Sequence, residues 1–478
     1  MVAKHLTIRN LSATPIELKA VERFAAEEPP KPKPDFKNLT KSISTLVNNI
    51  TRSDAEVPPV AQDAKPFARQ EVSVHIKPFE TVKTKVEAFV KSDKERLRLT
   101  FSAEGEKHQI YTPVPTSESA TMKALVDKPR FRFTGIYVTP HSHLAIYSSA
   151  NMQAWMKELR DDTLTSAISI PGTHNSPTCH VAAPSVRCQA VSPRVQLENG
   201  VRFFDIRVCP QHPKDPSKDH LLLVHSVFPV ALSCLKYFRE VVNDVESFLE
   251  RNPSETLIMS IKREGAGEHT DEQLCRILRD HYVGKSKRWY TEPKIPTLGE
   301  ARGKIVLVRR FGLDDHAKKQ HNGRGWGIDA GGWADNTPHA TCPSGCICIQ
   351  DFYEVLETEN IDQKIEYIKA HIGRSAECRY PFGVLKAESH DHKKTPFYIN
   401  FLSASNFWKI KTWPEKIAAK VNPAIVDYLC REHKGEKGDW GTGILVCDWV
   451  GLDGDWDLVR CIVGMNTKLM MRQRQEKA

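Results

Sequence analysis

Short apolar runs alternate with longer amphipathic stretches from residue 155 almost to the end of the chain. Eight runs have the length of strands, at residues 167–170, 203–208, 221–225, 257–262, 305–310, 347–351, 398–403 and 444–449. Stretches with helical spacing of apolar residues lie between or after them, at residues 233–251, 270–283, 361–372, 414–433 and 456–472. Strands alternating with helices favour a parallel sheet, so we predict an α/β fold, a TIM-type (distorted β/α) barrel.

The first 150 residues have a different pattern of apolar and polar residues. Strand-like runs occur at residues 6–11, 72–76, 97–101 and 134–139, and loop-like segments at residues 29–34 and 56–66. Residues 35–52 have helical spacing of apolar residues, which predicts one inserted or appended helix. We therefore predict an N-terminal mainly-β, sandwich-like domain over residues 1–150 and a barrel domain over residues 151–478. No catalytic pattern occurs in the N-terminal domain, and its role stays open.

The net charge limits the kinds of partner that we expect. The chain has 68 Lys and Arg against 59 Asp and Glu, a net charge of +9. This mild excess favours anionic surfaces such as membrane phosphates but lacks the dense basic stripe of nucleic-acid binders, so no nucleic acid is expected. The sequence shows neither the apolar core of a signal peptide nor an apolar run of about 18 residues. We expect a cytoplasmic protein without a transmembrane segment, peripheral at membranes.

Ionisable or amide side chains stand at the ends of most predicted strands. They are His174 with Asn175, Asp205 with Arg207, His225, Lys262, Arg310, Asp351 and Asp448. In a TIM-type barrel the catalytic groups lie at the carboxyl ends of the strands, and the packed interior tolerates charge poorly. The pattern therefore predicts one shared polar pocket at that end of the barrel.

Two histidines with an arginine between them suit the cleavage of a phosphodiester by acid–base chemistry. One imidazole takes a proton and the other gives one, while the guanidinium of Arg207 holds the phosphate. A neighbouring hydroxyl held near the phosphorus attacks as an internal nucleophile, so a cyclic phosphate forms first. A single histidine at a strand end is more often structural, and His174 and His225 differ through their joint placement with Arg207.

Eight segments of this region resemble the phosphatidylinositol-specific phospholipase C family, particularly its bacterial, metal-independent branch. In chain order they are IPGTHNS, GVRFFDIR, LLLVHS, NPSETLIMSIKRE, ARGKIVLVRRF, IQDFY, YINFLSAS and GILVCDW, which extend over about residues 151–466. The resemblance implies a phosphodiesterase acting on phosphatidylinositol or a related inositol phospholipid at a membrane surface. The implied products are diacylglycerol and a 1,2-cyclic inositol phosphate.

The resemblance also implies roles for the catalytic residues. His174 is similar to the general base that takes the proton of the inositol 2-hydroxyl, and Asp448 to the carboxylate that orients it. His225 resembles the general acid. Arg207 matches the guanidinium that contacts the phosphate where eukaryotic phospholipases C hold calcium, and Asp205 helps to hold this array.

Four further positions match residues that bind the inositol headgroup. Lys262, Arg310 and Asp351 resemble residues that bind inositol hydroxyls, and Tyr353 the ring that stacks on the sugar face. From the residues alone, residues 262–264 read equally well as a solvated charge run.

Asn175 departs from the bacterial pattern, which has an aspartate directly after the first histidine. Asparagine occupies this place in the calcium-dependent eukaryotic enzymes, where it is a metal ligand. Calcium held by Asn175 and Asp205 is therefore an alternative. We favour no metal and no other cofactor, because Arg207 puts a permanent positive charge where the cation would lie.

Two other functions fit the pattern less well. A glycerophosphodiesterase-like enzyme would need a metal-binding acidic cluster near the first histidine, which the residues around His174 lack. An inactive lipid- or glycan-binding scaffold would not need two histidines, Arg207 and Asp448 together, although Asn175 leaves room for it.

Three lesser motifs have both a functional and a packing interpretation. A glycine-rich loop with Trp326 and Trp333, and a basic run ending in Trp289 and Tyr290, are candidates for a lipid interface. Three cysteines resemble half of a zinc site but lack a second pair of ligands; they are Cys342, Cys346 and Cys348.

Overall fold

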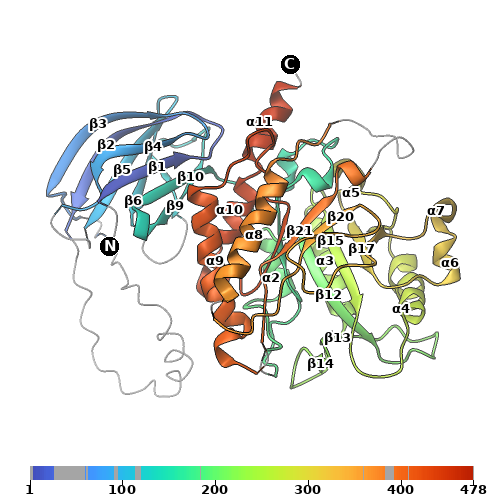
Figure 1. Cartoon of the computed structure of the whole chain (residues 1–478). Helices are drawn as coiled ribbons and strands as arrows, with labels where there is room; N and C mark the ends of the chain where they lie inside the picture. Colours follow the sequence, from blue (N-terminus) through green and yellow to red (C-terminus); the bar gives the residue numbers. More distant parts are fainter. Residues whose placement is uncertain are drawn as a thin grey trace. The chain divides into compact units, whose positions relative to one another are not determined.

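The computed structural model describes residues 4–25, 60, 63–90, 95–113, 120–183, 185–358, 360–382, 392–406 and 408–476. The chain divides into two compact units, Met1–Ser149 and Ala150–Ala478 (Figure 1). The helix predicted at residues 35–52 lies outside the described residues.

The first unit contains two five-stranded sheets, ordered β4-β1-β10-β9-β7 and β3-β2-β5-β6-β8. The strands are β1 (His5–Asn10), β2 (Ile16–Phe24), β3 (Ala68–Ile76), β4 (Thr81–Glu87), β5 (Arg96–Ala103), β6 (Glu106–Thr112), β7 (Ala120–Thr121), β8 (Lys123–Ala124), β9 (Phe133–Val138) and β10 (His143–Ser148). Side chains of both sheets share one apolar core, for example Ile8 and Leu144 from one and Leu99 and Phe101 from the other. The two sheets therefore pack face to face as a sandwich.

The second unit is built on a twelve-stranded sheet whose centre is seven parallel strands. In spatial order they are β17 (Ile305–Arg310), β15 (Leu257–Arg263), β12 (Phe203–Pro210), β11 (Ile170–Thr173), β22 (Ile444–Cys447), β21 (Phe397–Phe401) and β20 (Ile347–Gln350). Each strand sends at least one apolar side chain into a single buried cluster. The sheet thus curves around its own core, as in a β/α barrel.

Three two-residue strands extend the ends of this sheet. They are β16 (Trp289–Tyr290) and β18 (Ile328–Asp329), both parallel to β17, and β19 (Ala340–Thr341), antiparallel to β20. Cys342 and Cys346 belong to the buried apolar cluster of the barrel. These thiols therefore have a packing role, and no metal-ligand cluster includes them among the residues that the structure describes.

Helices follow most barrel strands. They are α2 (Pro193–Glu198), α3 (Phe238–Arg251), α4 (Asp271–Ile277), α5 (Leu298–Ala301), α6 (Asp315–Lys318), α7 (Gln320–Gly323), α8 (Asn360–Ala376), α9 (Pro414–Arg431), α10 (Asp457–Gly464) and α11 (Thr467–Gln475). The face of α3 that includes Phe238, Val242, Val245 and Leu249 is buried, as its helical spacing predicts. Within the described ranges, no helix combines the length and apolar character required to cross a bilayer.

The third predicted barrel strand was assigned wrongly. Residues Leu221–His225 form β13, which runs antiparallel to the end of β12 and makes a hairpin with β14 (Phe228–Pro229). A crossover between parallel strands needs about a dozen residues or more, and residues 211–220 are too few for it. Seven parallel strands, not eight, therefore form the centre of the barrel.

The first strand also lies later in the chain than predicted. Residues Thr165–Ala167 form a 3₁₀ turn, and the strand is Ile170–Thr173, which contains Pro171 and Gly172. A Cβ atom at Gly172 would come within 2.9 Å of the Phe203 side chain, so the neighbouring strand approaches closely only because this residue is glycine. The Pro-Gly pair, which normally ends a strand, here serves close packing.

A buried arginine ties the amino-terminal side of the barrel together. Arg202 is 0% exposed, and its Nε donates to a carboxylate oxygen of Glu255 at 3.0 Å. Its Nη atoms donate to four main-chain carbonyls, those of Met152, Gln153, Leu197 and Val201. The guanidinium therefore satisfies several otherwise orphaned acceptors.

We expect Arg202→Met to lower the free energy of unfolding by about 3–5 kcal/mol, because it leaves the buried Glu255 carboxylate without its charged partner. Urea unfolding followed by tryptophan fluorescence measures this. The control is Arg194→Met, which breaks an exposed ion pair with Glu198 that contributes about 0–1 kcal/mol. Equal losses in the two variants would contradict a structural role for Arg202.

Candidate active site

The side chains that face the barrel interior change from apolar to charged along each strand. On β12, Phe203 lies in the apolar core, and Asp205 and Arg207 follow at alternate positions on the same face. The strand register aligns Arg207 with Lys262, and Lys262 with Arg310. A row of positive charges therefore crosses three neighbouring strands at their carboxyl ends, where barrel enzymes hold their ligands.

His174 is held by the carboxyl end of β22. The register of β11 and β22 pairs Thr173 with Cys447, so His174 comes level with Asp448. Nδ1 of His174 lies 2.9 Å from Oδ1 of Asp448, and Gln189 donates to the carbonyl of His174 at 2.7 Å. The carboxylate fixes the orientation of the imidazole, and Nε2 is the ring nitrogen left for a substrate.

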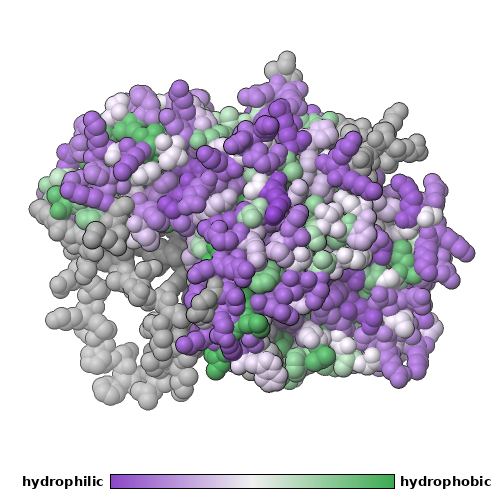
Figure 2. Space-filling model, viewed as in Figure 1, coloured by the Kyte–Doolittle hydropathy of each residue, from purple (hydrophilic) through white to green (hydrophobic). Residues whose placement is uncertain are grey.

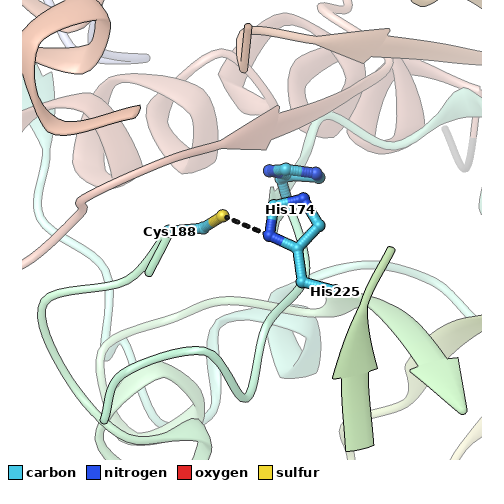
Figure 3. Close-up of side chains that lie close together, drawn as sticks. All are labelled: His174, Cys188 and His225. Carbon is cyan, nitrogen blue, oxygen red and sulfur yellow. Dashed lines mark hydrogen bonds between the residues drawn. The ribbon is translucent and has the colours of Figure 1, made fainter. Parts of the chain in front are cut away.

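His225 lies next to His174, although it comes from the hairpin strand β13. The two rings make an edge-to-face contact, with centroids 5.5 Å apart and planes at 83°. Nδ1 of His225 lies 2.9 Å from the carbonyl oxygen of Val186 and 3.6 Å from Sγ of Cys188 (Figure 3). Two imidazoles thus converge on one place, each with a polar partner at Nδ1.

Arg207 lies between two carboxylates. Its Nε and Nη2 donate to one oxygen of Asp205, both at 3.2 Å, and its Nη1 donates to Glu264 at 3.4 Å. Glu264 also accepts from Lys262 at 2.7 Å and from the main-chain nitrogen of Ser226 at 2.9 Å. The guanidinium therefore has a defined position, and some of its N–H groups remain available to donate to a bound anion.

The environment moves the pKa values of the two histidines in opposite directions. Burial alone would lower the pKa of His174, but the negative charge of Asp448 outweighs burial and raises it. Burial and the positive charge of Arg207 lower the pKa of His225 to about 3. In the ligand-free site the surroundings therefore favour the charged form of His174 and the neutral form of His225.

The acidic residues around Arg207 stay ionised. Burial raises the pKa of Asp205, but the charge of Arg207 and other nearby cations outweigh burial and lower it overall. The pKa of Glu264 is likewise well below its ordinary value, because Arg207 and Lys262 outweigh the effect of burial. The site therefore holds fixed negative charges that balance part of the cationic row.

A second polar group extends the site along β17 and β20. The guanidinium of Arg310 stacks on the ring of Trp333 at 3.9 Å, and Nε1 of Trp333 donates to Asp351 at 3.0 Å. Nη1 of Arg310 lies 3.7 Å from Asp205. Tyr353 donates to the carboxylate of Asp335 at 2.9 Å and is partly exposed. Arg310 thus links this group to Asp205.

Comparison with known proteins assigns the family. Residues 140–311 match the family model described as phosphatidylinositol-specific phospholipase C, X domain. A 1-phosphatidylinositol phosphodiesterase of Listeria monocytogenes is 33% identical over 316 residues, which are 64% of this chain and 83% of that protein. The chain belongs to the phosphatidylinositol-specific phospholipase C family.

Other members of the phospholipase C family agree with this assignment. A 1-phosphatidylinositol phosphodiesterase of Staphylococcus aureus (strain Newman) is 28% identical over 349 residues, 70% of this chain and 99% of that protein. A solved structure of a mutant phosphatidylinositol-specific phospholipase C from Staphylococcus aureus superposes with a TM-score of 0.51 at 25% identity. It covers 66% of this chain and 98% of that one.

Sequence reasoning missed two groups in this phospholipase C-type site. Glu264 was treated as part of a possible solvated charge run, but its side chain is only 12% exposed and contacts Arg207. Cys188 lies in the loop before α2, far from any strand end, and no sequence pattern relates it to His225. Its contact depends on how this loop packs over the site.

The two tryptophan motifs do not form a lipid interface. Trp326, Trp289 and Tyr290 are buried, each less than a tenth exposed, and Trp333 packs against Arg310 and Phe401. These interface hypotheses were wrong because both segments pair with or pack beside β17, which draws their rings into the protein.

We expect Asp448→Asn to lower the pKa of His174, because it removes the negative charge that raises this pKa. NMR titration of ¹³C-labelled histidine measures the change directly. Titration of His180 in the same sample is the internal control, since neither Asp448 nor His174 is among the causes of its shift. An unchanged His174 titration would show that Asp448 does not set its charge.

Proposed function

We propose that this protein is a phosphodiesterase that cleaves phosphatidylinositol, or a related inositol phospholipid, to diacylglycerol and a 1,2-cyclic inositol phosphate. The observation that carries the proposal is the pair of imidazoles, 5.5 Å apart, with His174 oriented by Asp448. Arg207, which the Asp205 carboxylate positions, belongs to the same network of charges. Family membership supports the same reaction, since both bacterial relatives bear the name 1-phosphatidylinositol phosphodiesterase.

In the proposed reaction, Nε2 of His174 takes the proton of the inositol 2-hydroxyl as its oxygen attacks the phosphorus. The bond from phosphorus to the diacylglycerol oxygen breaks, and His225 gives that oxygen a proton. Arg207 stabilises the negative charge that grows on the phosphate oxygens. One P–O bond forms as another breaks and two protons are transferred, so the net reaction converts the phospholipid into the cyclic phosphodiester and diacylglycerol.

The pKa shifts of the ligand-free site favour the proton on the wrong histidine for this reaction. A base must be neutral, but the pKa of His174 is raised; an acid must be protonated, but the pKa of His225 is lowered. Arg207 is a main cause of the lowering at His225, and a phosphate anion on Arg207 would oppose it. We propose that substrate binding moves the proton from His174 to His225 and so prepares the catalytic state.

We propose that the reaction needs no calcium. Both carboxylate oxygens of Asp205 face guanidinium groups, Oδ2 that of Arg207 at 3.2 Å and Oδ1 that of Arg310 at 3.7 Å. Oδ1 of Asn175 is buried and has no hydrogen-bond partner among the described residues, which alone would suit a cation. A calcium ion between Asn175 and Asp205 would meet two permanent positive charges, so this donor set does not fit it.

The second polar group is the proposed headgroup site. Lys262 and Arg310 offer donors, Asp351 offers acceptors and Tyr353 offers an aromatic face, a set suited to a ring with several hydroxyls. Asp351 and Arg310 are held through Trp333, so their spacing is rigid before any ligand arrives. This set of groups supports binding of an inositol headgroup. A protein that only binds lipid would not need the pair of histidines.

The exposed apolar side chains of the second unit support action at a membrane surface. Among the described residues of this unit, every large exposed one lies after a barrel strand and before the next helix; they are Val181, Val227, Phe228, Leu232, Leu235, Leu356, Trp408, Ile410 and Leu452. Figure 2 shows apolar side chains along the lower edge of this unit, where Figure 1 has β13 and β14. The face that carries the site therefore also carries the apolar surface that a lipid interface requires.

Phosphorus NMR of the protein acting on phosphatidylinositol micelles tests the proposed function. We expect the signal of a five-membered cyclic inositol phosphate in EDTA, and no increase in rate on adding calcium. His174→Ala and His225→Ala should each lower the rate by about 10²–10⁴-fold. The control variant is His180→Ala. His180 is a partly exposed histidine that follows β11, as His174 does, but it does not belong to the hydrogen-bonded network of the site.

Each other outcome of this experiment contradicts part of the proposal. Product formed only with calcium would mean that Asn175 and Asp205 hold a metal after all. Absence of product in both conditions, from a protein that melts cooperatively, would remove the phospholipase activity and leave the binding scaffold.

We expect the double variant Leu232→Ala, Trp408→Ala to bind phosphatidylinositol vesicles about tenfold more weakly, because two exposed apolar side chains no longer enter the lipid. Vesicle sedimentation measures the binding. The rate on a water-soluble inositol phosphodiester should stay the same, which separates lipid contact from catalysis. Undiminished sedimentation would exclude this face as the lipid contact.

A further inference from the structure

Cys188 brings a sulfur atom into the acid–base pair. The residue is 0% exposed, and its Sγ lies 3.6 Å from Nδ1 of His225 and 3.4 Å from the carbonyl oxygen of Val186. The proposed reaction has no use for a thiol at this place. Burial raises the pKa of Cys188, so it is a neutral thiol in the ligand-free site.

The three side chains form a compact set of metal-ligand atoms. One ring nitrogen each of His174 and His225 and the sulfur of Cys188 all lie within 4.8 Å of one another (Figure 3). A tetrahedral zinc site with bonds of about 2.0–2.3 Å places its ligand atoms roughly 3.3–3.6 Å apart. Small rotations of the side chains therefore suffice to bring all three atoms onto one ion.

The residues around this set provide the support that metal-binding histidines usually have. Histidine ligands commonly use their second nitrogen to bond a carboxylate or a main-chain carbonyl. Nδ1 of His174 already has the Asp448 carboxylate at 2.9 Å, which leaves Nε2 for an ion. Thiolate and imidazole ligands together select zinc and similar ions over calcium and magnesium, which prefer oxygen.

We propose that His174, Cys188 and His225 form a reversible zinc site that inhibits the enzyme. The bound ion occupies Nε2 of His174, the ring nitrogen that takes the proton in the proposed reaction, so substrate turnover and zinc binding exclude each other. Three protein ligands leave the fourth position of the ion open to water. The binding itself depends only on the three side chains, whereas its inhibitory effect rests on the proposed function.

Zinc binding releases protons from the site. The thiol of Cys188 loses its proton as the sulfur binds the ion, and the imidazolium of His174 loses one as Nε2 does. The positive charge of Arg207 opposes the ion, and the carboxylates of Asp448 and Asp205 favour it. Because protons compete with the ion for these ligand atoms, we expect the affinity for zinc to rise with pH.

Cobalt(II) and zinc(II) titrations of the purified full chain test the binding without any substrate. Cobalt bound by a thiolate gives a ligand-to-metal charge-transfer absorption in the near ultraviolet, and zinc displaces it. We expect this band with one ion per chain, and its loss in Cys188→Ser and in Cys188→Ala. Cys179→Ser is the matched control, because Cys179 lies on the same loop but outside the cluster, and it should keep the band.

Activity assays then separate this inference from the proposed function. In EDTA-treated protein, added zinc should abolish phosphatidylinositol cleavage, and excess EDTA should restore it. Relative to its own activity in EDTA, Cys188→Ser should need at least tenfold more zinc for half inhibition. An enzyme active in EDTA that shows no charge-transfer band, or equal zinc sensitivity in Cys188→Ser, would overturn the zinc site alone. A band without cleavage in EDTA would overturn the proposed function and leave the metal site in place.

Discussion

Asp205 is a fully buried carboxylate on which the whole active end of the barrel depends. It accepts two hydrogen bonds from Arg207 and one, at 3.1 Å, from the main-chain N–H of Asn175. Its Oδ1 lies 3.7 Å from Nη1 of Arg310. These contacts connect β12 with β17 and with the turn that follows β11. A lone charge at such depth would be costly, so the carboxylate and its guanidinium partners require one another. The same balance keeps Arg207 in the position where the proposed reaction needs a cation for the phosphate.

Much of this site follows from the sequence, because alternation along strands has a simple geometric consequence. Residues at the carboxyl ends of parallel strands meet in space, and His174, Arg207 and Asp448 were predicted to meet for that reason. His225 lies at the same place, but its strand β13 belongs to a hairpin and is not one of the parallel barrel strands. The predicted position of His225 beside His174 is confirmed, although the topology behind the prediction was wrong.

The parts that sequence reasoning missed depend on packing between distant segments. Glu264 has an ordinary position in a charged run directly after β15, and only the folded structure brings its carboxylate to 3.4 Å from Arg207. Cys188 reaches His225 because the loop before α2 folds back over the barrel, where Gln189 donates to the carbonyls of His174 and Cys447. Trp326 looked like a surface residue in a glycine-rich loop, but tertiary contacts bury it. No local pattern contains such information.

The central claim is that His174 acts as base and His225 as acid, although the pKa shifts in the ligand-free site favour the reverse protonation. Substrates with different leaving groups separate the two roles, because a nitrophenolate leaves without a proton whereas the alkoxide of diacylglycerol needs one. Rates for His174→Ala and His225→Ala should be measured on phosphatidylinositol and on a nitrophenyl inositol phosphate. The account predicts that His225→Ala loses about 10²–10⁴-fold on the lipid but far less on the nitrophenyl ester, whereas His174→Ala loses similarly on both. The opposite pattern, with His174→Ala rescued by the better leaving group, would contradict it.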